Sequence, residues 1–116
     1  MEIYQVKNLN GTSDERYLNA RKDRGCTTWI GFWRHYNKTR SPRPKRRCSV
    51  SCCKRKGRVG AHVHFTIPSD DGTWYIIPMC LSHNHPSVKE ELTVIPSAYE
   101  YKAPVRPKDN FTCNMP

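Results

Sequence analysis

The chain has 116 residues, a net charge of +10 and only 36% hydrophobic residues. A chain this short and polar cannot build a large hydrophobic core, and it has no apolar run of the roughly 20 residues that a membrane-spanning helix needs. We therefore expect one domain over residues 1–116, without a membrane partner, stabilised by a metal ion or by disulfides. The six cysteines and five histidines could bind a metal ion, and the cysteines could instead form disulfides.

A short strand is expected near Ile3–Val6, and a helix within residues 26–37. The helix has large apolar side chains at i, i+1, i+4 and i+7, which lie on one helical face. They are Trp29, Ile30, Trp33 and Tyr36. Thr27 or Thr28 precedes them as a candidate N-cap. We expect this aromatic helix to pack on the rest of the core. The alternative is that its rings stack on nucleic-acid bases.

The basic residues are concentrated in one segment, residues 38–58, which holds ten Lys or Arg and no acid. The rest of the chain has ten basic and ten acidic residues, so this segment accounts for the whole net charge. Such a local field predicts an anionic polymer as partner, DNA or RNA, although a solvated loop is the simpler alternative. The candidate phosphate contacts are Arg40, Arg43, Lys45, Arg46, Arg47, Lys54, Arg55, Lys56 and Arg58.

A β-hairpin is predicted after the basic segment. Apolar residues alternate from Val59 to Phe65, a polar turn follows at Asp70-Asp71-Gly72, and Trp74–Ile77 forms the return strand. A brief helical turn should follow and end near Pro86. Residues 88–95 end in a β-branched run that favours a further strand. The proline-rich residues 96–116 are expected to be an irregular tail.

Cysteine and histidine residues stand on both sides of the hairpin, at spacings that suit a zinc ion. Cys48 with either Cys53 or Cys52 forms a knuckle before it, and Cys80 with His83 lies after it. A thiol and an imidazole at i and i+3 can share a metal but cannot form a disulfide. The order of a knuckle, a hairpin and a helical turn along the chain predicts an α+β, zinc-stabilised domain of treble-clef type.

Several stretches of the sequence resemble a group of small bacterial and phage zinc proteins related to the HNH and treble-clef fold. They are Lys7–Thr12, Cys26–Trp29, Cys48–Cys53, Val59–Val63 and Trp74–Asn84. The resemblance implies that Cys53, and not Cys52, is the second knuckle ligand, and that Cys80 and His83 complete the site. The sequence departs from the group in a longer basic stretch at 41–47 and in its extra knuckle cysteine.

The same features predict the cellular compartment in which the protein is found. Residues Met1–Lys7 lack the apolar stretch of a secretion signal. With zinc-type cysteine spacing, this predicts a reducing compartment. Together with the resemblance, it leads us to expect the cytoplasm of a bacterial or phage-infected cell.

Three functions are consistent with these patterns. The first is a zinc protein that binds nucleic acid without strong sequence preference. The second is an HNH-like metal-dependent nuclease with His62 as general base, helped by His64, Asn84 or His85. In this sequence Ala61 precedes His62, where such nucleases usually carry an acid. The third is a phage-type inhibitor or adaptor that binds another protein.

Overall fold

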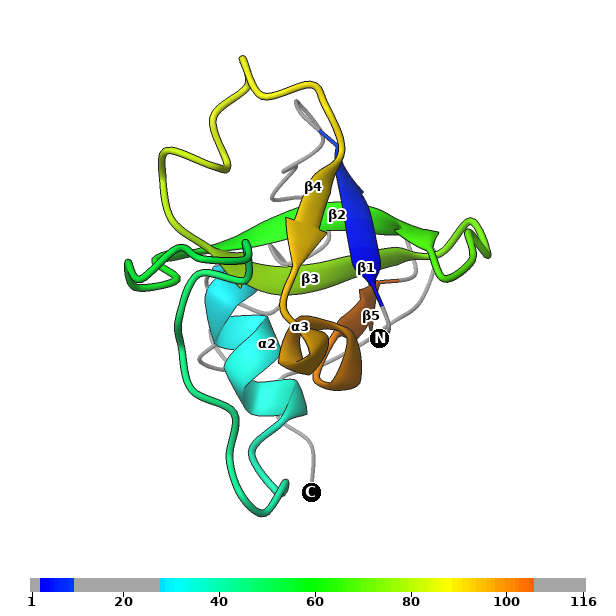
Figure 1. Ribbon diagram of the computed structural model, residues 1–116. Helices are drawn as coiled ribbons and strands as arrows, with labels where there is room; N and C mark the ends of the chain where they lie inside the picture. The colour runs from blue at the N-terminus through cyan, green and yellow to red at the C-terminus, as the bar shows by residue number, and fades with distance from the viewer. Residues whose placement is uncertain (1–2, 10–27, 106–116) are drawn as a thin grey trace.

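An antiparallel sheet of five strands forms the centre of the structure (Figure 1). The computed structural model describes residues 3–9 and 28–105. The elements are β1 (Tyr4–Asn8), α2 (Trp29–Tyr36), β2 (Val59–Ile67), β3 (Trp74–Met79), β4 (Leu92–Val94), α3 (Pro96–Glu100) and β5 (Ala103–Val105). The strand order is β4-β1-β2-β3-β5, with each neighbouring pair antiparallel. The fold is therefore α+β, as the sequence predicts.

The β2–β3 hairpin divides the core into two faces. Ala61 pairs with Ile77 and His62 pairs with Ile76. Because successive side chains of a strand point to opposite faces, each of these pairs belongs to a different side of the sheet. The hairpin turn has Gly72 at φ +77°, a conformation that glycine adopts without steric cost. The predicted hairpin is thus confirmed.

Helix α2 covers one face. Its N-cap is Thr28, whose hydroxyl accepts a hydrogen bond from the Gly31 backbone N–H at 3.1 Å. The start of the helix lies directly on Gly60, where a Cβ atom would come within 2.6 Å of the backbone of α2. A side chain at this position of β2 would therefore displace the helix. The buried cluster on this face contains Trp29, Ile30, Phe32, Trp33, Ile76, Ala103 and Val105.

The predicted apolar face of the helix is largely confirmed, with one correction. Tyr36 is 48% exposed, and Phe32 is buried instead. Phe32 is one residue from Trp33 and so extends the buried face sideways, whereas Tyr36 lies in the last turn, at the end of the helix. The tryptophans are core residues in this structure, because Trp29 and Trp33 are 4% and 3% exposed.

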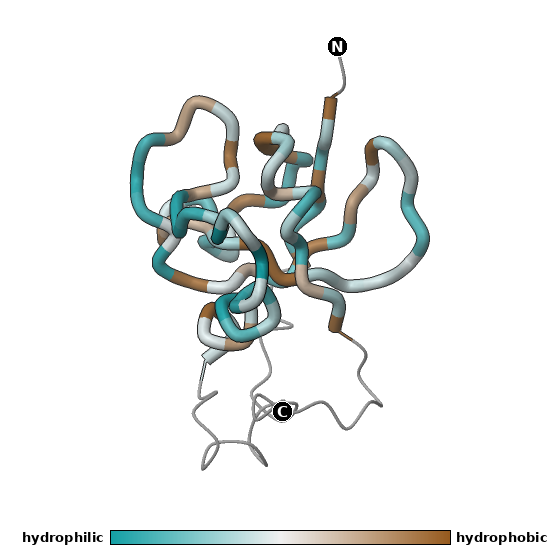
Figure 2. The backbone as a smooth tube through the Cα atoms, turned by 90° about the horizontal axis from the view of Figure 1, so that it is seen from below, coloured by the Kyte–Doolittle hydropathy of each residue, from teal (hydrophilic) through white to brown (hydrophobic). Residues whose placement is uncertain are grey.

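A second cluster fills the opposite face of the sheet. It contains Val6, Cys48, Val50, Ala61, Val63, Phe65, Ile77, Met79, Cys80, Val94 and Ala98. Figure 2 shows hydrophobic stretches of the chain converging towards the middle of the molecule, while most of the peripheral loops are hydrophilic. Two cysteines thus lie within an apolar cluster, at the end of the sheet where the chain enters and leaves the hairpin.

The prediction of an irregular tail from residue 96 is wrong for its first ten residues. Pro96 begins the short helix α3, where its missing N–H costs no hydrogen bond, and β5 then pairs with β3. Ala103 and Val105 are buried against α2, so this part of the chain closes the core. The strand expected within 88–95 is confirmed as β4. No helix in the described part of the chain is long and apolar enough to cross a membrane.

Candidate metal centre

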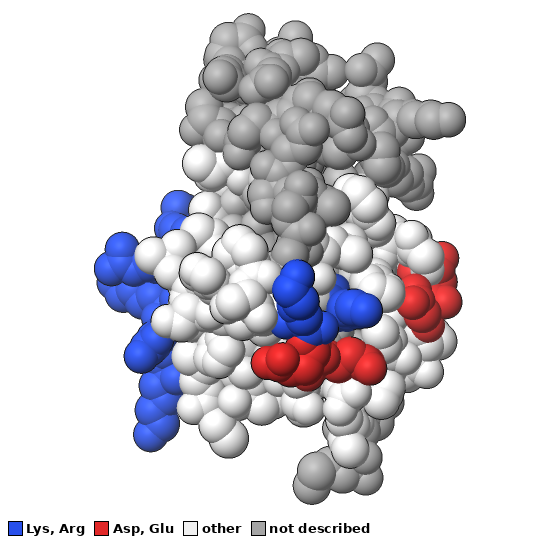
Figure 3. Space-filling view, turned by 90° about the horizontal axis from the view of Figure 1, so that it is seen from above, with Lys and Arg blue, Asp and Glu red and all other residues white. Residues whose placement is uncertain are grey.

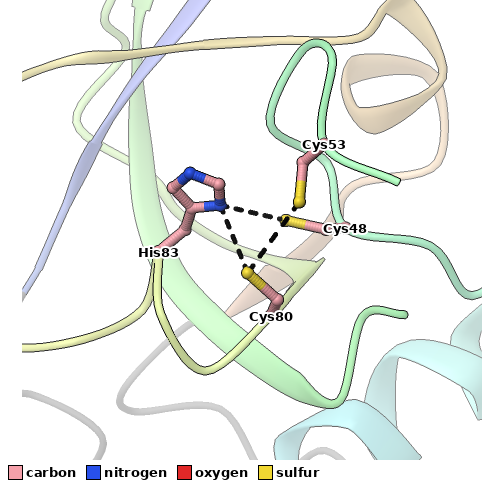
Figure 4. Close-up of side chains that lie close together, drawn as sticks. All are labelled: Cys48, Cys53, Cys80 and His83. Carbon is pink, nitrogen blue, oxygen red and sulfur yellow. Dashed lines mark hydrogen bonds between the residues drawn. The ribbon is translucent and has the colours of Figure 1, made fainter. Parts of the chain in front are cut away.

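Four side chains from two separate segments converge at the knuckle end of the sheet (Figure 4). They are Cys48, Cys53, Cys80 and His83, and their ligand atoms all lie within 4.8 Å of one another. The Nδ1 atom of His83 is 3.2 Å from Sγ of Cys80 and 3.6 Å from Sγ of Cys48. The sulfurs of Cys53 and Cys80 are 4.0 Å apart. The predicted quartet is therefore brought together, with Cys53 as its knuckle member.

These separations fit a tetrahedron around one small cation. With metal–sulfur and metal–nitrogen bonds of about 2.3 Å and about 2.0–2.1 Å, tetrahedral angles place two sulfurs about 3.8 Å apart and a sulfur and a nitrogen about 3.6 Å apart. Three of the separations, at 3.2, 3.6 and 4.0 Å, lie close to those values, and no two of the four ligand atoms are more than 4.8 Å apart. The four groups are thus close enough to hold a metal ion without a change of fold.

The knuckle geometry explains why Cys53 joins the quartet and Cys52 does not. The backbone N–H of Cys53 donates to the Val50 carbonyl at 3.1 Å, which closes a tight turn. Within that turn Cys52 has φ +67°, a left-handed conformation that a non-glycine residue adopts at some cost. Its thiol is exposed, whereas Cys48 is buried and Cys53 half-buried.

Backbone hydrogen bonds tie the knuckle to the sheet on both sides. The Ser49 N–H donates to the Pro78 carbonyl in β3 at 2.9 Å. The Ser49 carbonyl accepts from the N–H of Ile95 at 2.8 Å, just after β4. Ser49 is itself only 2% exposed. Strands β3 and β4 therefore fix the position of Cys48 before any metal binds.

The second ligand pair lies on a single turn that follows β3. The Asn84 N–H donates to the Cys80 carbonyl at 3.1 Å, which closes the turn and places Cys80 and His83 on one side of it. The next regular element is β4, so the expected helical turn is a single turn. Asn8, 6% exposed, donates from Nδ2 to the His83 carbonyl and to Asn84 Oδ1, each at 3.3 Å. Strand β1 thus braces the His83 turn.

The thiols of the quartet differ in how readily they ionise. Burial raises the pKa of Cys48 to about 11. Burial also opposes ionisation of Cys80, but hydrogen bonds from the His83 backbone and from neighbouring side chains outweigh it and lower the pKa to about 7. A buried thiol such as Cys48 loses its proton only when a positive charge is close, and a bound metal ion supplies that charge.

His62 lies away from this centre, on the opposite face of the sheet. It is 1% exposed, and its ring centroid is 4.5 Å from that of Trp29 and 6.1 Å from that of Trp74. Neither ring nitrogen has a hydrogen-bond partner among the described residues, and burial lowers the pKa to about 4. A general base must reach a water molecule and a phosphodiester. The buried ring of His62 has no access to either.

The other residues of the nuclease hypothesis do not gather around His62. His64 pairs with Asp70 at 2.8 Å, and His85 contacts the Ser87 hydroxyl at 2.9 Å. The amide oxygen of Asn84 accepts from Asn8. Within residues 3–9 and 28–105, the zinc-type quartet is the one group of His, Cys, Asp or Glu side chains placed to hold a metal. The unassigned Cys26 and Cys113 lie outside the described residues.

The basic segment divides into two parts. In the first part, arginines contact the protein itself. Arg46 donates to the carbonyls of Gly57 and Arg58, Arg47 to the carbonyl of Cys53, and Arg43 to that of Lys38. Arg40 lies 3.9 Å from the Glu100 carboxylate and over the Tyr101 ring. In the second part, Lys54, Arg55, Lys56 and Arg58 line surface hollows beside the metal quartet.

Two supporting residues could not be found from the sequence. Asn8 braces the His83 turn, and the Ser82 hydroxyl accepts from Arg55 Nη1 at 2.8 Å. Both contacts join residues far apart in the chain, so no local pattern marks them. Asn8 lies in β1 but beyond the strand predicted near Ile3–Val6, so nothing in the sequence indicated its role.

Comparison of the chain with protein-family models, with curated proteins and with solved structures finds no match.

Proposed function

We propose that the protein is a zinc-binding domain of treble-clef type that binds nucleic acid through the basic surface around its metal knuckle. The observation that carries this proposal is the position of residues 54–58, which lie beside the converging quartet of Cys48, Cys53, Cys80 and His83. The same loops hold the metal ligands and the cations. In this treble-clef reading, the single turn at Cys80–His83 takes the place of the usual helix.

The donor set favours zinc over other common metals. Three thiolates and one imidazole in a tetrahedron are typical of structural zinc sites, whereas magnesium and calcium prefer oxygen ligands. All four positions are filled by the protein, so the site has no open position for catalysis. The role proposed for the metal is therefore to stabilise the fold and to hold the two ligand loops in place.

The basic segment carries more positive charge than is needed to balance the negative charge of the metal centre. Three thiolates and a neutral imidazole around Zn²⁺ leave a net charge of about −1. One nearby cation balances that charge, but residues 38–58 hold ten. In Figure 3, Lys and Arg form a band without acidic neighbours along the edge of the molecule where the 51–57 turn lies in Figure 1, whereas a second, smaller group of basic residues lies beside acidic ones. A cationic edge of this kind suits the phosphate backbone of a nucleic acid.

Binding to nucleic acid is tested by fluorescence anisotropy with a labelled DNA and a labelled RNA oligonucleotide at 50 to 200 mM salt. We expect binding to both that weakens steeply with salt, because phosphate contacts release counterions. Little difference between oligonucleotide sequences is expected, since backbone contacts carry no sequence information. Absence of binding at the lowest salt would refute the proposal and favour a protein partner with an acidic surface.

A further inference from the structure

Two surface hollows lie side by side next to the metal quartet. The first, about 400 Å³, is lined by Arg55, Lys56, Arg58, Cys80, Leu81 and Ser82. The second, about 560 Å³, is lined by Ser51, Cys52, Cys53, Lys54, Arg55, Ser82 and His83. Volumes of this size are in the usual range for small-ligand sites, about 300–1,000 Å³. Each hollow therefore has room for a phosphate and part of a sugar.

Arg55 and Ser82 belong to both hollows. The Nη1 atom of Arg55 donates to the Ser82 hydroxyl at 2.8 Å, and this contact joins the knuckle loop to the His83 turn. The bond uses one of the five N–H donors of the guanidinium, so the others remain for a ligand. The Arg55–Ser82 contact thus places one cation between the two hollows.

The linings of both hollows are cationic and contain metal ligands. Lys56 and Arg58 line the first hollow with Arg55, and Lys54 lines the second. Among residues 3–9 and 28–105, no acidic residue lines either hollow. Cys80 contributes to one wall and Cys53 and His83 to the other, so the loops that hold the metal also determine the shape of both hollows.

The basic residues earlier in the segment differ in this respect. Arg40, Arg43 and Lys45 lie outside both hollows. The first two already contact protein groups, the Glu100 carboxylate and the Lys38 carbonyl respectively. These three side chains do not line either hollow, so a phosphate bound in one of them would not contact these cations directly. The ten basic residues are therefore not equivalent.

We propose that the two hollows beside the Arg55–Ser82 contact form the phosphate subsite of the protein, each taking one of two neighbouring phosphates of a nucleic-acid strand. Arg55 bridges the two phosphates, Lys56 and Arg58 bind the first, and Lys54 binds the second. This inference rests on the proposed function and assigns binding to residues 54–58 and Ser82, while the positive charge of residues 40–45 contributes only through the general field.

The test compares two triple variants with the same loss of charge, K54A/R55A/R58A and R40A/R43A/K45A. Anisotropy of a labelled 12-nucleotide single-stranded DNA is followed as a function of salt. For K54A/R55A/R58A we expect affinity to fall by about 100-fold at 50 mM salt, and the slope of log K against log salt to fall by about 1.4, the value for two phosphates of a single strand. For R40A/R43A/K45A we expect less than a tenfold loss and an unchanged slope.

A third variant keeps all charges. Ser82→Ala removes the acceptor that positions Arg55, and we expect affinity to fall several-fold while the zinc content and the thermal midpoint stay those of the wild type. Zinc content and unfolding are also measured for both triple variants, so that a folding defect is separated from a lost contact.

The outcomes separate the two proposals. If the wild-type protein binds DNA but the two triple variants lose affinity equally, the subsite is refuted and the proposed function stands. The same holds if Ser82→Ala binds like the wild type. If the wild type does not bind at all, the proposed function fails and the subsite fails with it.

Discussion

The two faces of the sheet stabilise the same strands by different means. On the α2 face, aromatic and aliphatic side chains bury against each other and enclose the imidazole of His62. On the opposite face, the apolar cluster includes Cys48 and Cys80, two of the four candidate metal ligands. One face is an ordinary core, whereas the other continues into a polar centre at its edge.

The contrast shows how a 116-residue chain with 36% hydrophobic residues can fold. The aromatic face supplies burial where the sequence has large apolar side chains, in α2 and β3. The knuckle face lacks such residues at its edge, and there a metal ion can hold the loops together instead. A substitution on one face should therefore change stability and metal binding differently from a substitution on the other.

The largest effect is expected from the loss of a metal ligand. Cys48→Ser should abolish zinc binding and lower the free energy of unfolding by about 5 kcal/mol, because the knuckle loses the ion that links it to the His83 turn. Cys52→Ser, in the same turn but exposed, should change it by less than about 0.5 kcal/mol. Urea unfolding with zinc in excess measures both. Equal destabilisation by the two variants would mean that the ligand assignment is wrong.

A large apolar deletion on the other face should destabilise the fold but keep the metal. Trp33 is 3% exposed and donates from Nε1 to the Tyr101 carbonyl at 2.9 Å. Trp33→Ala should cost about 3–5 kcal/mol, with zinc stoichiometry unchanged at temperatures where the protein is folded. Tyr36→Ala, on the exposed side of the same helix, serves as control. Loss of zinc from folded Trp33→Ala would show that the faces are not independent.

The buried imidazole should make the aromatic face sensitive to acid. Burial lowers the pKa of His62 from its ordinary value of 6.5 to about 4 in the fold, so the unfolded chain binds the extra proton first. The contribution of neutral His62 to the free energy of unfolding is therefore complete above pH 6.5 and is lost as the pH falls towards 4. At pH 5 the loss is about 2 kcal/mol.

His62→Leu removes this titration while keeping a buried side chain of similar size. Urea unfolding at pH 7.5 and pH 5 should show that the wild type loses about 2 kcal/mol more than the variant over this interval. Protonation of the metal ligands affects both proteins and cancels in the difference. If the free energy of unfolding depends on pH identically in the two proteins, the claim that His62 is buried and neutral is refuted.

The smallest effect is expected at the brace between β1 and the His83 turn. Asn8→Ala removes the donor to the His83 carbonyl and to Asn84. We expect about a tenfold loss of zinc affinity, in line with other groups that support metal ligands, and about 1 kcal/mol of stability. Competition with a chromophoric chelator measures the affinity. Lys7→Ala, exposed on the same strand, should leave it unchanged.

Local patterns predicted most of the fold and three of the four members of the metal quartet. Alternation in residues 59–65 predicted β2, and the pairing of a thiol with an imidazole at Cys80 and His83 predicted the second ligand pair. Between Cys52 and Cys53 the residues alone left both open. The difference lies in the backbone of the turn, where the left-handed conformation of Cys52 accompanies an exposed thiol.

What the sequence did not predict depends on distant contacts. Residues 96–105 are rich in proline and tyrosine and have little periodicity, yet β5 forms because β3 has an unpaired edge beside it. His62 has the same local pattern whether it faces solvent or a tryptophan. The packing of α2 against Gly60 decides that it is buried, and this contact joins residues about 30 positions apart.

The central claim is that Cys48, Cys53, Cys80 and His83 hold one zinc ion, and X-ray absorption at the zinc edge tests it most directly. The experiment uses the purified protein loaded with one equivalent of zinc. We expect three sulfur neighbours at about 2.3 Å and one nitrogen neighbour at about 2.0–2.1 Å. A shell of four sulfurs, or one dominated by oxygen and nitrogen, would contradict it.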